Sequence, residues 1–241
     1  SGIVIVRYRG AQRATGGTVT RSGNDTIHTF TSSGTFSVID SSWVIGLPDF
    51  SGNNNFALSS GNPSWYFGSI SFSGSQYFVC DALSNYNFGS AITVVVWHRN
   101  IGGDYRGVVS NVYSSGTGFD LRYGREDYFG GSNNGTRLAC SIRTSVGNYG
   151  VSINAELNVW GCYAMTYDGS TLRSYKNGSQ FTTVAASGTL GSVSNPVTIG
   201  RNSSGTEYLT GRLGNVVIYN RALSSSEIDQ LFQASRDRYG V

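Results

Sequence analysis

Short segments that alternate polar and apolar residues recur from residue 70 onward, and this pattern constrains the fold more than any other feature. The segments are rich in β-branched and aromatic residues, and Gly, Ser or Asn separates each one from the next. The pairs Asp168-Gly169 and Asn177-Gly178 are typical of tight hairpin turns. Many short strands joined by turns predict an all-β fold, a two-sheet antiparallel sandwich of the jelly-roll type. The expected strands cover residues 70–72, 77–80, 92–97, 107–110, 118–123, 137–142, 160–167, 172–176, 197–199 and 213–219.

A helical pattern occurs near the C-terminus. Ser224 to Ser226 supply N-cap residues, and Glu227 places a negative charge in the first turn. We therefore expect a short C-terminal helix after the last strand. Its apolar face, at i, i+3 and i+4 spacing, would consist of Ile228, Leu231 and Phe232.

The composition is compatible with a folded sandwich. Gly, Ser and Asn make up 88 of the 241 residues, a share that also occurs in disordered chains. However, 39% of the residues are hydrophobic and 13% are aromatic, which argues for a buried core. Only 13% are charged, so the surface depends on neutral polar residues, as in extracellular or particle-bound proteins.

Positive charge is concentrated at the N-terminus. Residues 1–39 contain four arginines against Asp25, whereas the other 202 residues carry 13 basic and 13 acidic groups. A neutral main domain argues against a nucleic-acid groove, which needs a dense positive surface. The arginines that we expect to form an attachment segment are Arg7, Arg9, Arg13 and Arg21.

Three regions are expected along the chain. Residues 1–39 contain short strands but are too few to be stable alone, so we expect them to attach to a neighbouring protein or to another copy. Residues 40–69 contain two prolines and are expected to be a linker with loops leading into the main domain. Residues 70–241 are expected to form the jelly roll and its helix. Because the sequence begins with Ser1 rather than Met, we expect a fragment, a processed product or the C-terminal part of a longer chain.

The three cysteines, Cys80, Cys140 and Cys162, are an odd number, so at least one is free or pairs with another chain. Each lies in an alternating segment, which predicts a small buried residue. A disulfide between Cys140 and Cys162 is the alternative that the sequence does not decide. The absence of a CxxC motif or a Cys/His cluster argues against zinc. No apolar run reaches the roughly 18 residues of a membrane helix, and no signal peptide is recognisable, so we expect no membrane insertion.

The order of motifs over residues 70–235 resembles the laminin-G-like, concanavalin A-type lectin/glucanase domain. Three blocks carry the resemblance, at residues 72–97, 160–178 and 199–224. The most specific is the end of the last block, where the sequence YNRALS at 219–224 precedes the expected helix. The resemblance implies a jelly roll in which these residues determine the fold and do no chemistry.

Folds related to this family include glycoside hydrolases, which need two carboxylates about 5–9.5 Å apart. The resemblance implies a Glu-x-Asp-x-x-Glu run on one strand, and no such run exists in this sequence. Glu126 and Asp127 are adjacent and would point to opposite faces of a strand, whereas Glu227 and Asp229 belong to the expected helix. No nucleophile elbow is present either. We therefore expect no catalytic residues and no enzymatic activity.

The resemblance raises the question of whether the chain binds calcium. Family members that bind it use Asp or Asn side chains and backbone carbonyls on rim loops. In this sequence the ligand positions of the first motif hold Ser73, Ser75 and Gln76 instead of acids. The last motif has Gly214-Asn215 where the family commonly has an acidic pair. We therefore expect no cofactor and no metal. The acids left as alternative calcium ligands are Asp81, Asp104 and Asp120.

Glycan binding needs exposed aromatic rings, which stack on sugar faces, and amide or carboxylate groups for the hydroxyls. Several expected loops offer this combination, although each such aromatic residue is also compatible with a core or inter-chain contact. The glycan-binding candidates are Trp65, Tyr66, Tyr105, Arg106, Tyr128, Asn133 and Asn134.

Residues 1–8 and 16–36 resemble the glycine-rich segments of tail-fibre and other structural proteins of tailed phages, which often precede a laminin-G-like domain. The order of the two resemblances predicts a non-enzymatic virion protein, a tail fibre or capsid decoration on the particle surface. Its expected partners are other virion proteins, copies of itself, or a cell-surface polysaccharide. The alternatives are a carbohydrate-binding module of a secreted, extracellular bacterial protein and, third, a glucanase-like hydrolase.

Overall fold

The computed structural model describes residues 2–9, 12, 14–38, 46–47, 53, 55, 57–61, 63–66, 68–103, 105–112, 116–124, 134–192 and 194–241. The chain divides into two compact units, Ser1–Val44 and Ile45–Val241. The expected boundary between residues 39 and 40 lies outside the described residues, so the division of the chain at that point stays a prediction.

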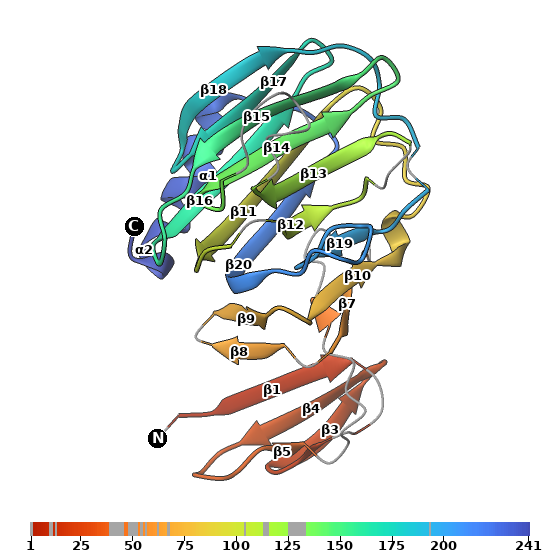
Figure 1. Ribbon diagram of the computed structural model, residues 1–241. Helices are drawn as coiled ribbons and strands as arrows, with labels where there is room; N and C mark the ends of the chain where they lie inside the picture. Colours follow the sequence, from red (N-terminus) through yellow and green to blue (C-terminus); the bar gives the residue numbers. More distant parts are fainter. Residues whose placement is uncertain are drawn as a thin grey trace. The chain divides into compact units, whose positions relative to one another are not determined.

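The N-terminal unit contains a three-stranded antiparallel sheet in the order β1-β4-β3 (Figure 1), with β1 at Val4–Arg9, β3 at Thr18–Ser22 and β4 at Asp25–Phe30. Two further short strands, β2 (Ala14–Thr15) and β5 (Ser37–Val38), pair with each other as a separate antiparallel sheet of this unit. The tight turn between β3 and β4 uses Gly23, whose φ is +58°.

The interior of this unit is small and polar. His28 is fully buried, and its Nε2 lies 3.0 Å from the Tyr8 hydroxyl while its Nδ1 lies 2.7 Å from the Gly16 carbonyl. Phe36 contacts the imidazole edge-on, with the ring centroids 5.1 Å apart. Among the described residues of the unit, the only other buried side chains are those of Ala14 and Thr26.

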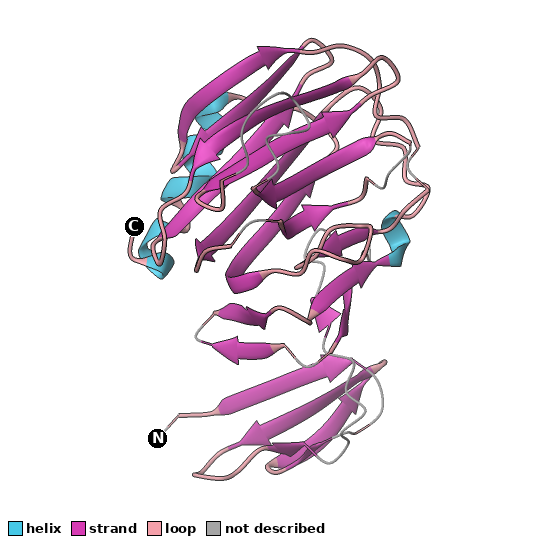
Figure 2. Ribbon diagram, viewed as in Figure 1, coloured by secondary structure: helices cyan, strands magenta, loops and turns pink. Residues whose placement is uncertain are grey.

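The first sheet of the larger unit has eight strands among the described residues. They are β6 (Gly46–Leu47), β7 (Ala57–Ser60), β10 (Tyr77–Cys80), β12 (Arg106–Ser110), β13 (Gly118–Tyr123), β14 (Arg137–Arg143), β15 (Asn148–Asn154) and β19 (Val197–Ile199). Their order is β15-β14-β13-β12-β19-β10-β7-β6, and each neighbouring pair is antiparallel. Figure 2 shows the strands of the structure in magenta.

The second sheet has seven strands in the described part of the chain. They are β8 (Ser64–Tyr66), β9 (Ser69–Ser73), β11 (Ile92–Asn100), β16 (Trp160–Tyr167), β17 (Thr171–Lys176), β18 (Ser179–Ala185) and β20 (Thr210–Tyr219). Their order is β18-β17-β16-β11-β20-β9-β8, again with antiparallel neighbours. Jelly rolls have this kind of interleaved connection between two sheets.

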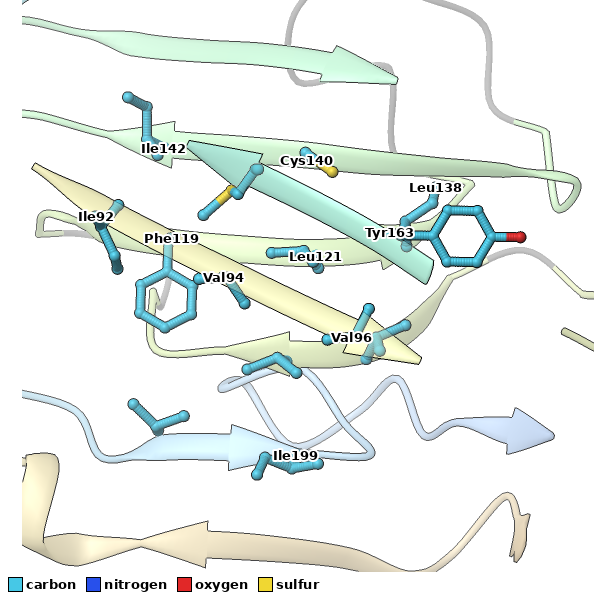
Figure 3. Packing of buried hydrophobic residues seen from close by; sticks show 14 of the residues in the cluster. Ile92, Val94, Val96, Phe119, Leu121, Leu138, Cys140, Ile142, Tyr163 and Ile199 are labelled. Atoms are coloured by element: carbon cyan, nitrogen blue, oxygen red, sulfur yellow. The ribbon is translucent and has the colours of Figure 1, made fainter. Parts of the chain in front are cut away.

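The main core fills the space between the sheets. In β11 the alternation of the strand sends Ile92, Val94 and Val96 into this core, whereas Val95 and Trp97 belong to a second cluster on the opposite face. Figure 3 shows the inward side chains of β11 beside those of β13 and β14. The central strand is therefore buried on both faces, which explains its nearly continuous apolar sequence.

A helical layer covers the second face of β11. Helix α1 (Ser225–Gln233) begins with a capping box, in which the Ser224 hydroxyl accepts the Glu227 N–H and the Glu227 carboxylate accepts the Ser224 N–H. Phe232 of α1 stacks on Trp97 with ring centroids 5.8 Å apart. Tyr239 of the short helix α2 (Arg236–Tyr239) stacks on the same indole at 4.3 Å.

The predicted fold is confirmed: an antiparallel two-sheet jelly-roll sandwich with a C-terminal helix. Each expected strand is present, and α1 begins where the cap predicts. No expected element corresponds to β15, β18 or α2. The strands β15 and β18 stand at the edges of their sheets, and most of β18 is exposed, so its sequence shows little apolar alternation.

The expectation of loops throughout residues 40–69 was wrong for part of that range. Residues 57–60 form β7 because they pair with β10, and residues 64–66 form β8 because they pair with β9. These strands have only four and three residues, so their sequence resembles a loop until a neighbouring strand supplies hydrogen bonds. The rest of the linker prediction concerns residues that are largely outside the described part.

All three cysteines are buried and none of them forms a disulfide, as the small-residue interpretation predicts. Cys80 and Cys140 belong to the main core, whereas Cys162 points to the second cluster under the helices. The seven-stranded sheet therefore separates Cys140 from Cys162, which excludes the bridge that the sequence left open.

Candidate functional site

Several loops of the larger unit meet at one end of the sandwich. Asn100, at the end of β11, donates from Nδ2 to the Gly135 carbonyl at 2.8 Å, and its own carbonyl accepts the Asn158 N–H at 2.7 Å. The Gly107 N–H, at the start of β12, donates to the Glu207 carbonyl at 3.2 Å. The loops after β11, before β14, after β15 and after β19 are therefore neighbours.

Three of the glycan-binding candidates lie at this end. Tyr105 and Arg106 stand at the beginning of β12, and Asn134 lies in the turn before β14, next to the Gly135 that Asn100 contacts. The Asn134 side-chain oxygen accepts the Thr136 N–H at 2.9 Å, so this oxygen closes its own turn. Its amide nitrogen is left for other contacts.

The other candidates lie elsewhere or outside the described residues. Trp65 is on β8, at the edge of the seven-stranded sheet and three strands from β11, which corresponds to roughly 14 Å. The backbone of Tyr66 belongs to the same strand, but its side chain is outside the described part. Tyr128 and Asn133 are also outside it. The sequence candidates therefore do not form one cluster in the described structure.

Tyr105 is held in an uncommon backbone conformation. Its φ is +58°, and its side chain is 42% exposed. A bulky residue with positive φ is rare outside functional or strained turns. Gly103 beside it has φ +102° and packs against Arg106, because a Cβ at Gly103 would lie 2.8 Å from the Arg106 Nε. The turn thus presents the Tyr105 ring and holds the Arg106 guanidinium.

Two tyrosines and a second arginine complete the arrangement. Arg106 donates to the Tyr208 carbonyl at 3.3 Å, and Arg201 pairs with Tyr208 in an isolated β-bridge. The Arg201 guanidinium lies over the Tyr77 ring, and the rings of Tyr77 and Tyr208 are 6.0 Å apart. We call these five residues, including Tyr105, the arginine–tyrosine patch.

Sequence reasoning missed Tyr77, Arg201 and Tyr208. A signal for Tyr77 was available, because the alternation that sends Phe78 and Cys80 into the core sends Tyr77 to the outer face. Arg201 and Tyr208 lie in a Ser/Gly-rich loop whose path is set by contacts with distant strands, so no local pattern announces them.

A buried ion triad lies next to the patch on the outer face of the eight-stranded sheet. Arg122 of β13 donates from Nε to Asp120 at 2.7 Å and from Nη1 to Glu207 at 2.6 Å. The exposed fractions of Asp120 and Arg122 are 3% and 5%. Burial alone would lower the pKa of Arg122, but the Asp120 and Glu207 carboxylates outweigh it, so that pKa lies above its ordinary value. The triad fixes the loop after β19, which carries the Arg201 and Tyr208 of the patch.

The described residues show no hydrolase geometry. The acids that come together on the outer face, Asp120 and Glu207, both hydrogen-bond to one guanidinium instead of facing an open cleft.

Burial lowers the pKa of His98 to about 3, and its Nδ1 lies 3.0 Å from the Tyr123 hydroxyl. Neither His98 nor His28 has a serine hydroxyl partner among the described contacts.

The two described candidates for calcium ligands, Asp81 and Asp120, do not form a calcium site. The Asp120 carboxylate is engaged by Arg122, Asp81 lies exposed in a single 3-10 turn at Asp81–Leu83, and Asp104 is outside the described residues. Within the described part of the chain, no three His, Cys, Asp or Glu side chains come together as metal ligands do.

A separate hollow lies between the edge strands of the two sheets. It has a volume of about 350 Å³ and is lined by β15 with Arg137 and by β18, including Phe181. Phe181 is 45% exposed, and Arg137 donates to the Ser152 hydroxyl. This hollow is open and has one aromatic ring, so it offers fewer stacking surfaces than the arginine–tyrosine patch.

Residues 72–229 match the family model described as the concanavalin A-like lectin/glucanases superfamily. No curated protein matches the chain. None of the described helices is long and apolar enough to cross a membrane.

Solved structures share the fold at low identity. The receptor-binding domain of the botulinum neurotoxin C/D mosaic serotype is 13% identical, with a TM-score of 0.57 over 78% of this chain and 48% of that one. The binding domain of Paraclostridial Mosquitocidal Protein 1 is 18% identical, with a TM-score of 0.57 over 78% and 49%. Domain 4 of AbnA, an extracellular GH43 arabinanase from Geobacillus stearothermophilus, solved with arabinotriose, is 14% identical, with a TM-score of 0.57 over 72% and 82%. The chain thus spans about half the length of the toxin chains that it matches.

Proposed function

Because the chain belongs to the concanavalin A-like lectin/glucanase superfamily, we propose that its larger unit is a non-enzymatic glycan-binding module. The observation that carries this proposal is the arginine–tyrosine patch, where aromatic rings and hydrogen-bond donors converge at the loop end of the sandwich. Sugar sites in proteins combine these two elements, since rings stack on the apolar sugar face and polar groups bind the hydroxyls. Tyr105 is an exposed member of the patch.

The similar structures support a binding role. The arabinanase domain was solved with arabinotriose, and the toxin domains are receptor-binding or binding domains. The buried Asp120–Arg122–Glu207 triad supports the absence of hydrolysis, because Arg122 holds both carboxylates. The candidates Trp65, Tyr66, Tyr128 and Asn133 remain predictions that a bound ligand would test.

A glycan array probed with the full chain tests this proposal, followed by calorimetry on the best hit. The informative variant is Tyr105→Gly, because glycine favours the positive φ of this position and only the ring is lost. We expect weaker binding for this variant and unchanged binding for Phe181→Ala, which removes an exposed ring at the other hollow. An array without any hit, or loss of binding with Phe181→Ala alone, would contradict the proposal.

We also propose that the N-terminal unit attaches the module to a virion of a tailed phage, as part of a tail fibre or a capsid decoration. Its β1 strand is an edge of the three-stranded sheet, and the apolar residues Ile3, Val4 and Ile5 are each at least 60% exposed. An exposed apolar edge strand favours pairing with another chain. Of the arginines proposed for attachment, Arg7 pairs with Asp25 and Arg21 is exposed on β3. Only the backbone of Arg9 is described, and Arg13 is outside the described residues.

Mass spectrometry and electron microscopy of purified native particles test the virion role. The expected result is the chain in stoichiometric amount on the particle surface, with residues of β1 paired to a neighbouring chain. Recovery of the chain only from culture medium as a secreted protein would overturn the virion role and favour the extracellular carbohydrate-binding alternative.

A further inference from the structure

Arg106 and Arg201 of the patch have no acidic partner among the described residues. The Arg106 side chain donates to one group, the Tyr208 carbonyl, and the Arg201 side chain contacts the Tyr77 ring. The Nε atoms of both guanidinium groups are buried, and neither has a hydrogen-bond partner in the described structure. A buried Nε is out of a ligand's reach, so a ligand would bind the Nη groups of the two guanidinium groups, whose positive charge no described acid neutralises.

The nearest acids are already engaged. The Glu207 backbone accepts the Gly107 N–H at 3.2 Å, which places this residue beside the start of β12, but its carboxylate turns to Arg122. Asp120 turns to the same guanidinium. The triad therefore carries a net charge of −1, and the two arginines of the patch add +2, which leaves a local excess of positive charge.

The two arginines are held in place before any ligand arrives. Arg106 is fixed by the Tyr208 carbonyl, and Arg201 is fixed against the Tyr77 ring. Gly107 lies against the backbone after β19, since a Cβ there would be 2.1 Å from the Asn202 nitrogen and 2.3 Å from the Arg201 carbonyl carbon. Preorganised side chains lose little conformational entropy on binding.

We propose that the patch binds acidic glycans, with Arg106 and Arg201 holding an oxyanion of the sugar and the tyrosines contacting its ring. This inference rests on the proposed glycan-binding function and adds the class of ligand. A guanidinium matches the geometry of a carboxylate or sulfate with two parallel hydrogen bonds. A neutral sugar has hydroxyl groups only, so it would satisfy the same donors without neutralising their charge.

Calorimetry with matched oligosaccharide pairs tests the proposal on the full chain. The pairs are 3′-sialyllactose with lactose, trigalacturonate with galactotriose, and 6-sulfolactose with lactose, measured at low salt. We expect an acidic member to bind at least about ten-fold more tightly than its neutral partner, because charge-assisted hydrogen bonds are stronger than neutral ones. The first two pairs distinguish sialic from uronic carboxylates, and the third reports on sulfate.

Three variants locate the effect. Arg106→Gln and Arg201→Gln should each abolish most of the preference for the acidic member, and Arg201→Lys should keep part of it because it retains charge without the planar fork. The matched control is Arg236→Gln, which removes one positive charge from α2, on the helical face of the other sheet.

The outcomes separate the inference from the proposed function. Equal affinity for acidic and neutral members, or a preference that survives Arg106→Gln and Arg201→Gln, overturns the inference and leaves glycan binding intact. Binding to no glycan on the array overturns both. Loss of the preference in the Arg236→Gln control shows a non-specific charge effect and also overturns the inference.

Discussion

The Arg201 guanidinium lies over the Tyr77 ring, with its Cζ 3.6 Å from the ring centroid. Tyr77 belongs to β10 and Arg201 follows β19, two neighbouring strands of the eight-stranded sheet. A cation over an aromatic face is worth about 0.5–2 kcal/mol, depending on how far it is desolvated. The contact therefore orients both side chains of the proposed binding site.

Tyr77→Ala should weaken the binding of a glycan found on the array by about ten-fold, while Tyr77→Phe should retain most of the affinity. The ring itself supplies the stacking surface and positions Arg201, and the loss of an aromatic contact costs about 1–1.5 kcal/mol. Calorimetry on both variants measures the effect. Equal losses for the Ala and Phe variants would show that the hydroxyl, not the ring, matters.

Arg122→Met should lower the free energy of unfolding by about 3–5 kcal/mol, because it leaves the buried Asp120 carboxylate and the half-buried Glu207 carboxylate without their counter-charge. Urea unfolding monitored by tryptophan fluorescence at pH 7 measures it. Arg173→Met is the control, since its ion pair with Asp168 is partly exposed and should cost no more than about 1 kcal/mol.

Removal of the triad's acids gives a second test of the same claim. Adding Asp120→Leu and Glu207→Met to Arg122→Met should restore much of the lost stability, because no charge then remains buried. A single Arg122→Met variant as stable as the control, or a triple variant less stable than the single one, would contradict the buried-charge explanation.

Stability should fall as the pH drops below about 6.5, and His98 is the physical cause. Burial lowers the pKa of His98 from 6.5 to about 3, so the folded protein keeps it neutral while the unfolded chain takes up a proton. The contribution of neutral His98 to the free energy of unfolding is fully present above pH 6.5. It is lost at up to about 1.4 kcal/mol per pH unit as the pH falls toward 3.

The pH range in which His98 lowers the stability differs from the range in which the carboxylates do so. Hydrogen bonds from Arg173 and Ser170 hold the pKa of Asp168 below its usual value, and Arg221 lowers that of Glu227 to about 2, so these groups lose their contribution only below about pH 4.5. Unfolding midpoints between pH 7 and 5 therefore report on His98. A flat profile there, or an NMR signal of a protonated His98 imidazole in the folded protein at pH 5, would refute the assignment.

The three thiols should be unreactive toward a thiol reagent in the native protein and should react together on unfolding. All three are buried, which keeps the reagent away from them, and burial raises the pKa of Cys162 to about 12 and that of Cys140 further, so these two form almost no thiolate. Ellman titration with and without denaturant measures the number of thiols. Fewer than three thiols in the denatured, unreduced protein would indicate a disulfide.

The candidate site was predictable only in part. Tyr105 and Arg106 were identified because an aromatic residue beside a cation in a loop suits a sugar site. Trp65 was identified because it stands beside a second aromatic residue, Tyr66, in an expected loop, yet it lies on a different strand at the sheet edge. A criterion based on neighbours in sequence cannot distinguish these cases, because the distance between loops depends on the order of strands in the sheets.

The sequence by itself determined that this chain folds as a jelly roll with a capped C-terminal helix. Alternation, turn residues and the Ser224 cap act over a few residues, so their physical effects are visible locally. Only the tertiary structure decided where the binding groups meet. Tyr77, Arg106 and Arg201 are far apart in the chain, and they converge because the sheet order places β10, β19 and β12 side by side. It also decided that Asp120 and Glu207 share one arginine, since that contact closes only when the loop after β19 packs against β13.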